Sequence, residues 1–147
     1  MIGKTDKGFV ADGLALYTGR IAKMAAIDQV VIPEAGRGDP AYQQRTESER
    51  VLAAIKPGEK IVLLDELGEQ LGSTAFADRL QAWKDQGVRQ IAFVIGGAYG
   101  HSDPLREKAD MILSLSRMTF PHQLVRVLFA EQLYRAHMIM EGRPYHH

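Results

Sequence analysis

The sequence predicts an α/β fold in which helices flank a mostly parallel sheet. Three short, largely apolar runs lie at residues 61–64, 91–95 and 111–115, and the first is continuous, as expected for a strand buried on both faces. Helical patterns separate these runs, and strands that alternate with helices form parallel sheets. We expect a single domain over residues 1–147, since this length suits one hydrophobic core.

The N-terminal part of the chain is expected to add two helices and one strand before this alternation begins. Residues 9–24 place apolar side chains at helical spacing, which predicts a helix. Residues 28–32 form a short β-branched run that a proline stops, and we expect a strand there. A charged helix is predicted over residues 42–55, and Pro57 with Gly58 closes it.

Three further helices are predicted around the apolar runs. Ser73 or Thr74 is expected to cap the first, and Asp103 opens a short second one. A long third helix over residues 121–141 carries a broad apolar face. Because this face is wider than one sheet surface needs, part of it is expected to be buried in a symmetric homodimer.

Composition narrows the classes of function. The 18 basic and 18 acidic residues cancel, so we do not expect a whole-surface electrostatic grip on nucleic acid. Cysteine is absent, which excludes disulfides and thiolate zinc sites, and no other spacing of histidines and carboxylates marks a metal site. No apolar run approaches the length that crosses a bilayer. We therefore expect a cytoplasmic protein that binds neither a metal nor a membrane.

The loops that follow the three apolar runs carry the candidate binding groups. Residues 65–68, 96–100 and 116–121 are rich in glycine, hydroxyls and charge. Ligands of open parallel sheets bind outside the carboxyl ends of the strands. If the three strands are neighbours, these loops line one site. The glycines of the middle loop match neither the dinucleotide-binding nor the phosphate-loop pattern, so on their own they indicate a tight structural turn.

A second candidate group lies at the start of the long helix. His122 and Arg126 are four residues apart, so they share a helix face. Together with Arg117 they are suited to hold an anionic RNA backbone, and a polar face in solvent is the alternative interpretation. The sequence has no nucleophile-elbow motif, and its serines and histidines lack an orienting acid, which argues against a hydrolase.

Several motifs, most of them C-terminal, are specific in combination. They are SLSRMTFPHQLVR at residues 114–126, EQLYRA at 131–136, PYHH at 144–147, LLDE at 63–66 and FVIGG at 93–97. With these motifs the chain closely resembles the ribosomal RNA large-subunit methyltransferase H family, which belongs to the SPOUT class. The resemblance is strong over residues 60–147 and looser over residues 3–59.

The resemblance implies a fold, a reaction and a cofactor. Enzymes of this class thread their C-terminal part into a trefoil knot. The implied reaction transfers a methyl group from S-adenosylmethionine to N3 of a pseudouridine in large-subunit ribosomal RNA, on assembled ribosomes. The family's cofactor contacts fall at the three strand ends described above, on Leu64, Gly96, Leu115, Ser116, Arg117, Met118, Thr119 and Phe120.

The resemblance also frames the remaining expectations. His122 is a candidate general base for the N3 proton, and Arg126 or Arg117 is a candidate for stabilising the developing anion. The candidates for clamping the extruded base and its phosphates are tail residues, namely Arg143, Tyr145 and His146. Family members begin with an apolar strand, and we expect only Met1 and Ile2 of it here. A non-catalytic ribosome-binding homodimer of the same fold is the alternative function.

Overall fold

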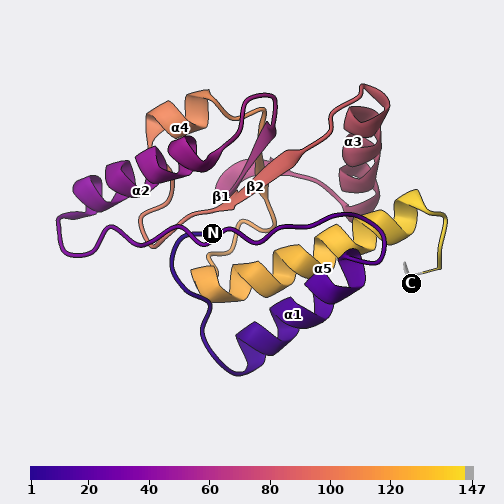
Figure 1. Ribbon diagram of the computed structural model, residues 1–147, viewed down its shortest axis with the longest axis horizontal. Helices are drawn as coiled ribbons and strands as arrows, with labels where there is room; N and C mark the ends of the chain where they lie inside the picture. Colours follow the sequence, from indigo (N-terminus) through magenta and orange to yellow (C-terminus); the bar gives the residue numbers. More distant parts are fainter. Residues whose placement is uncertain (145–147) are drawn as a thin grey trace. The chain divides into compact units, whose positions relative to one another are not determined.

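The computed structural model describes residues 1–144 and contains a three-stranded parallel sheet (Figure 1). Strand β1 (Lys60–Gln70) is central, and β2 (Ile91–Ile95) and β3 (Met111–Ser114) lie on its two sides. Both neighbours pair with β1 in parallel. The prediction of an α/β fold with a parallel sheet and flanking helices is confirmed.

Five helices accompany the sheet in the described residues: α1 (Phe9–Ile21), α2 (Pro40–Ala54), α3 (Ser73–Asp85), α4 (Asp103–Glu107) and α5 (His122–Met140). Each one lies where the sequence predicts a helix. The predicted cap of α3 is wrong, because Gly72 holds the N-cap position and Ser73 Oγ donates to Gln132 Oε1 over 2.8 Å. Within residues 1–144, no helix combines the length and apolar character that crossing a membrane requires.

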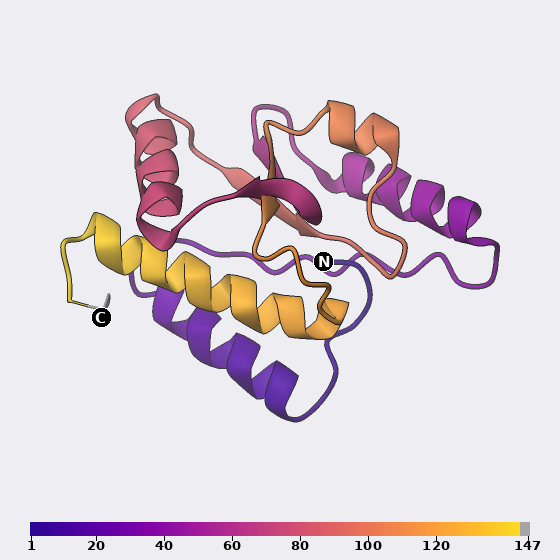
Figure 2. The same ribbon diagram turned by 180° about the vertical axis from the view of Figure 1, so that it is seen from behind.

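The chain divides into two compact units, and each unit draws on three separate segments. The sheet unit, which holds the sheet with α2 and α4, consists of Met1–Lys4, Gln29–Gln70 and Val88–His122. The helical unit, which holds α1, α3 and all but the first residue of α5, consists of Thr5–Asp28, Leu71–Gly87 and Gln123–His147. Within the helical unit, α1 and α5 run side by side in both views (Figures 1 and 2), and the ring centroids of Tyr17 and Tyr134 lie 6.1 Å apart.

Strand β1 runs past its predicted end and includes residues 65–68, for which the sequence predicts a loop. Leu64 and Glu69 both stand opposite Leu113 of β3, so the residues between them bulge out of the ladder. A glycine at the end of the bulge allows β1 and β3 to approach each other closely. A Cβ on Gly68 would lie 2.6 Å from a backbone carbonyl oxygen of β3, a distance that real side chains do not tolerate.

The predicted strand over residues 28–32 is wrong except at its last residue. Ile32 forms an isolated parallel bridge with Ile2, whereas Val30 and Val31 are 56% and 47% exposed. Because β-branched residues favour strands through packing rather than through the backbone alone, exposed valines do not extend the ladder. The backbone N–H of Ile2 donates to the last carbonyl of β2 over 3.2 Å, so the N-terminal residues lie against the sheet.

Candidate functional site

The residues that end the regular part of β1, before its bulge, and the carboxyl ends of β2 and β3 lie in adjoining rungs of the sheet. We call Leu64 the end of β1 in this sense, since the strand continues beyond the bulge to Gln70. Leu64 of β1 stands opposite both Ile95 of β2 and Leu113 of β3. The three following segments therefore start from one side of the sheet, as the sequence predicts for neighbouring strands. We call this side the carboxyl edge, and its segments are the bulge at residues 65–68, the glycine loop at residues 96–101 and the distal loop at residues 115–120.

Side chains of the protein itself pack closely against the glycines of the glycine loop. A Cβ on Gly96 would lie 3.0 Å from Cε1 of the His101 ring, and one on Gly97 would collide with the Glu47 carboxylate. The loop closes on itself through a hydrogen bond from the Gly100 N–H to the Gly97 carbonyl over 3.2 Å, with a φ of +69° at Gly100. From the sequence, a tight turn or the close approach of a ligand explains why glycines stand at these positions. The structure adds close packing by neighbouring side chains as a reason for them.

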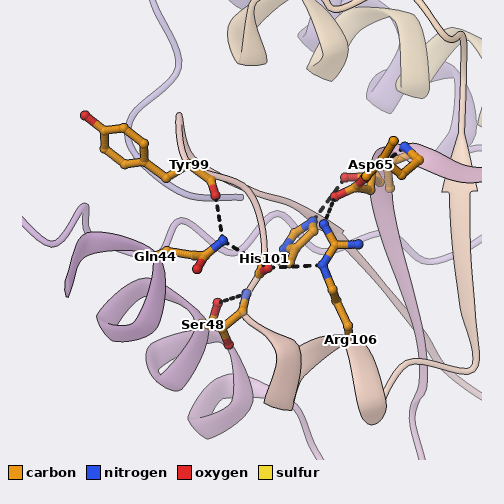
Figure 3. A network of polar contacts seen from close by, with 9 residues as sticks. Gln44, Ser48, Asp65, Tyr99, His101 and Arg106 are labelled. Atoms are coloured by element: carbon orange, nitrogen blue, oxygen red, sulfur yellow. Dashed lines mark hydrogen bonds and ion pairs between the residues drawn. The ribbon is translucent and has the colours of Figure 1, made fainter. Parts of the chain in front are cut away.

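Helix α2 holds the backbone of the glycine loop. The Gln44 side-chain amide donates to the carbonyl of Tyr99 over 2.9 Å and to that of His101 over 3.2 Å. One helical turn further on, the buried Ser48 hydroxyl accepts a hydrogen bond from the Ser102 N–H over 3.0 Å. Figure 3 shows both contacts and shows the Tyr99 ring pointing away from them. These contacts hold the backbone of the loop in one arrangement, and a preorganised backbone favours tight binding.

The His101 ring joins the glycine loop to the end of β1. Its side chain is buried, and the residue is only 3% exposed. The Nε2 atom lies 3.0 Å from the carbonyl oxygen of Leu64, and since a carbonyl only accepts, Nε2 carries the proton. Burial lowers the pKa of His101 and outweighs the opposing effects of this hydrogen bond and of Asp65, while Arg106 lowers it further. The ring is therefore neutral at physiological pH.

An ion pair extends this link to α4. Arg106 forms a short charge-assisted hydrogen bond with the carboxylate of Asp65, the first residue of the bulge (Figure 3). Its Nε atom donates to the His101 carbonyl over 3.1 Å. The Asp65 side chain is 9% exposed and that of Arg106 is 27% exposed, so solvent screens the pair only in part. One arginine thus orders the bulge and the glycine loop together.

The distal loop is held by hydroxyl groups. Ser114 Oγ donates to the Ser116 carbonyl over 2.9 Å, and Ser116 Oγ accepts from the Met118 N–H over 2.9 Å. Thr119 Oγ1 donates to a carboxylate oxygen of Glu66 over 2.7 Å, which ties the distal loop to the bulge. All three segments of the carboxyl edge are therefore linked to a neighbour by side-chain hydrogen bonds.

The groups at the carboxyl edge fit the adenosylmethionine that the resemblance implies. Leu67 and Met118 are 83% and 73% exposed, and apolar side chains of this kind favour contact with an adenine ring. The carboxylate of Glu66 favours a cationic sulfonium or ammonium group nearby. The ordered backbone of the glycine loop supplies amide and carbonyl groups for polar contacts.

The candidate residues of the long helix have different surroundings. His122 is the first residue of α5 and is half-buried, whereas Arg117 is exposed. Arg126 lies in the helical unit, is fully buried, and donates from Nη1 to Thr5 Oγ1 over 2.9 Å. This burial contradicts both interpretations of Arg126, as a cation that holds an RNA backbone and as part of a polar face in solvent. A buried guanidinium needs such a hydrogen-bonding partner.

The tail candidates are only partly described. Arg143 is exposed and forms an ion pair with Glu141, with 2.7 Å between Nε and Oε2. Such exposed pairs contribute little to stability, so the guanidinium is available to exchange this carboxylate for another anion. Tyr145 and His146 lie outside the described residues.

The polar network behind the glycine loop is absent from the sequence-based prediction. Gln44 and Ser48 are four residues apart, and this spacing places two polar side chains on one face of α2. That spacing was an available signal. No local pattern shows that His101 and Arg106 meet the end of β1, because their partners are 37 and 41 residues away in the chain.

Comparisons with known proteins give a consistent result. A family model described as "Predicted SPOUT methyltransferase" matches residues 1–146. A protein of Paramagnetospirillum magneticum is 46% identical over 145 residues, which cover 99% of this chain and 94% of the relative. A protein of Geotalea daltonii is 46% identical over 147 residues, and one of Christiangramia forsetii is 39% identical over 149 residues, with 99% and 95% coverage in both cases. All three relatives are named "Ribosomal RNA large subunit methyltransferase H".

Proposed function

This chain belongs to the SPOUT methyltransferase family, and we propose that it methylates large-subunit ribosomal RNA at N3 of a pseudouridine on assembled ribosomes. The methyl donor is S-adenosylmethionine, as in other SPOUT methyltransferases. The observation that carries the proposal is the meeting of three ordered segments at the carboxyl edge of a parallel sheet. The names of relatives that match almost the whole chain support ribosomal RNA as the substrate.

The residues that would hold the donor lie along the carboxyl edge. In this proposal they are Leu64, Gly96, Leu115, Ser116, Arg117, Met118, Thr119 and Phe120. When bound, the sulfonium of the donor supplies an already activated methyl group. The protein then has two tasks, which are to orient the donor against the target base and to deal with the N3 proton.

His122 is the proposed general base for the N3 proton. It lies two residues after the end of the distal loop, so it is close in the chain to the proposed donor contacts. Arg126 and Arg117 are the alternatives, acting by stabilising negative charge on the uracil ring. Arg126 is the weaker of the two because its side chain is buried and bonded to Thr5.

Recognition of the RNA is assigned to a local patch, because the net charge of the chain is zero. We place this patch in the tail, where Arg143 would contact phosphate and Tyr145 and His146 would stack on or clamp the extruded base. Deleting residues 143–147 should leave donor affinity within about twofold. Because base stacking contributes about 1–3 kcal/mol, methyl transfer to ribosomes should fall about tenfold or more. A parallel loss of donor affinity would show that the tail serves the donor site instead.

Three architectural features belong to the same proposal. A homodimer is supported by the wide apolar face of α5, and light scattering should give twice the chain mass of 16.3 kDa. A C-terminal trefoil knot and a single functional domain are supported by membership of the family. Mechanical stretching from the two termini tests the knot, since a knotted chain extends to less than its full contour length. A cytoplasmic location is supported by a ribosomal substrate.

The decisive experiment has two stages. Calorimetric titration with S-adenosylmethionine measures donor binding, and mass spectrometry of nucleosides from treated ribosomes measures N3-methylpseudouridine. We expect both donor binding and transfer. Binding of the protein to ribosomes without any methyl transfer would favour the non-catalytic homodimer, and absence of donor binding would remove the proposed reaction altogether.

A further inference from the structure

We propose that His101 is a positioning residue for the methyl donor, because its neutral ring fixes the end of β1 and the glycine loop at one spacing. The inference rests on the proposed function, in which Leu64 and Gly96 contact the donor. His101 itself is not among the residues that the sequence assigns to the site.

The ring lies against both of these proposed donor contacts. On one side Nε2 donates to the Leu64 carbonyl over 3.0 Å. On the other side Cε1 and Nδ1 lie 3.0 Å and 3.3 Å from the position that a Cβ would occupy on Gly96. The ring therefore acts as a spacer between two adjacent strand ends, and a movement of the ring would shift the carbonyl of one strand and the backbone of the other.

The backbone of His101 is held as firmly as its ring. Its carbonyl accepts hydrogen bonds from Gln44 of α2 and Arg106 of α4. At 3% exposure the side chain has no surface with which to reach a substrate, so a direct part in proton transfer is excluded. The remaining role is to hold the two proposed donor contacts at a fixed spacing. When the site is already ordered, less conformational entropy of the protein is lost as the donor binds.

Burial favours the neutral form of the ring, although the hydrogen bond to Leu64 is compatible with both protonation states. A protonated ring would still donate from Nε2, but it would also carry a buried charge beside Gly96. The charged groups that act on it are Asp65 of β1, which favours protonation, and Arg106 of α4, which opposes it. Burial lowers the pKa of His101 below its ordinary value of 6.5, so the spacer keeps its neutral form at neutral pH and loses it only in acid.

Three variants separate positioning from mere packing. His101→Gln keeps an N–H donor near the place of Nε2, whereas His101→Leu keeps bulk without a donor. His101→Asn is polar but too short to reach the Leu64 carbonyl. Without this hydrogen bond the Leu64 carbonyl and the glycine loop are no longer held at one spacing, so we expect His101→Leu and His101→Asn to raise the donor Kd about tenfold. His101→Gln should stay within about threefold of the unaltered protein, since it restores the hydrogen bond.

The kinetics give a second readout. We expect the KM for the donor to rise in the Leu and Asn variants, while kcat at saturating donor stays within about twofold because donor binding restores the spacing. A purely structural role would instead lower the melting temperature and the active fraction, with an unchanged donor Kd in the folded protein. If His101→Leu fails to fold, the comparison of His101→Asn with His101→Gln still decides the matter.

The state of the ring can be observed directly. Imidazole nitrogen chemical shifts should show the neutral Nε2–H tautomer at neutral pH. The donor Kd should rise as the ring protonates in acid, and this rise should be absent in His101→Gln. Equal donor affinity in all three variants, with normal binding by the unaltered protein, would overturn the inference. Absence of donor binding by the unaltered protein would instead contradict the proposed function.

Discussion

At the amino edge of the sheet, where β1, β2 and β3 begin, one partly exposed carboxylate links the start of β1 to the residue before β3. At the carboxyl edge, buried polar groups hold the loops. At the amino edge Asp110 accepts from Lys60 Nζ over 2.5 Å and from the Ile61 N–H over 2.8 Å, and its side chain is 29% exposed. At the carboxyl edge the polar groups include His101 and Ser48, which are 3% and 2% exposed.

The two edges thus differ in energetic cost. A carboxylate near the surface keeps part of its hydration, and its ion pair contributes little. A buried imidazole or hydroxyl is costly unless every hydrogen bond is made, so a network of such groups demands exact placement. The difference indicates that the contacts at the amino edge only have to hold the starts of the strands together. The carboxyl edge is built to hold its loops in one arrangement, as a binding site requires.

The largest expected effect comes from overfilling the carboxyl edge. In Gly96→Val the new side chain meets the His101 ring, which lies 3.0 Å from the Cβ position, so the glycine loop must shift. We expect the donor Kd from calorimetry to rise about tenfold or more, since overpacking typically costs about 1–3 kcal/mol. Gly19→Ala on α1, where a Cβ meets nothing within 4 Å, is the matched control. Unchanged affinity in a folded Gly96→Val protein would remove Gly96 from the site.

Removal of the arginine that spans the carboxyl edge should have the next largest effect. Arg106→Ala leaves the Asp65 carboxylate, which is 9% exposed, without its guanidinium partner. We expect the free energy of unfolding in urea to fall by about 2 kcal/mol, less than for a fully buried pair because Arg106 is partly exposed. The donor Kd should also rise. Arg45→Ala, at an exposed position of α2, should change neither quantity. Full stability in Arg106→Ala would show that the edge does not depend on this pair.

The amino edge should respond more weakly and in stability alone. Asp110→Ala removes the ion pair with Lys60 and the acceptor for the Ile61 N–H. We expect urea denaturation to show a loss of about 1 kcal/mol. Donor affinity should remain within about twofold, since distant sites are additive. A large loss of donor affinity in this variant would mean that the two edges are coupled and that the contrast between them does not hold.

The smallest effect is the pH dependence of stability. Burial lowers the folded-state pKa of His101 and of half-buried His137, so the folded protein binds fewer protons than the unfolded chain below pH 6.5. Stability should therefore be constant above that pH and decline as the pH falls through the lower, folded-state values. Thermal melts between about pH 5 and 8 measure this decline. It should be shallower in His101→Gln, and an unaltered profile would assign the whole effect to His137 and other groups.

Much of the fold follows from local patterns in the sequence. Largely apolar runs with helices between them predict the three strands, and β2 has the predicted bounds of residues 91–95. The shared carboxyl edge also follows, because parallel neighbours end on the same side. The strand predicted at residues 28–32 is wrong except at its last residue, because its two valines are exposed instead of packed in the core. The extension of β1 escapes prediction because it depends on Gly68 packing against β3, a contact that no local pattern records.

The sequence predicts which loops form the site, but it does not predict the side-chain contacts that hold these loops in place. The glycines and the distal loop are visible as motifs, and their location at strand ends gives them meaning. The positions of His101 and Arg106 are set by hydrogen bonds to the end of β1, and such contacts exist only after the chain has folded. Arg126 shows the converse, because its helical spacing suggests a surface cation and its burial against Thr5 contradicts that.

The order of the strands has a consequence during synthesis. The central strand β1 is synthesised before its two neighbours, β2 and β3. Val62 and Leu63 of β1, which are fully buried in the finished sheet, therefore lack both neighbouring strands at first. Asp110, which bonds to Ile61 just before β3 begins, follows 49 residues later. At translation rates of about 5–20 residues per second, the ribosome needs roughly 2–10 s to supply that stretch. During this interval the central strand lacks β3, so its apolar side chains cannot yet be buried on both sides as they are in the finished sheet.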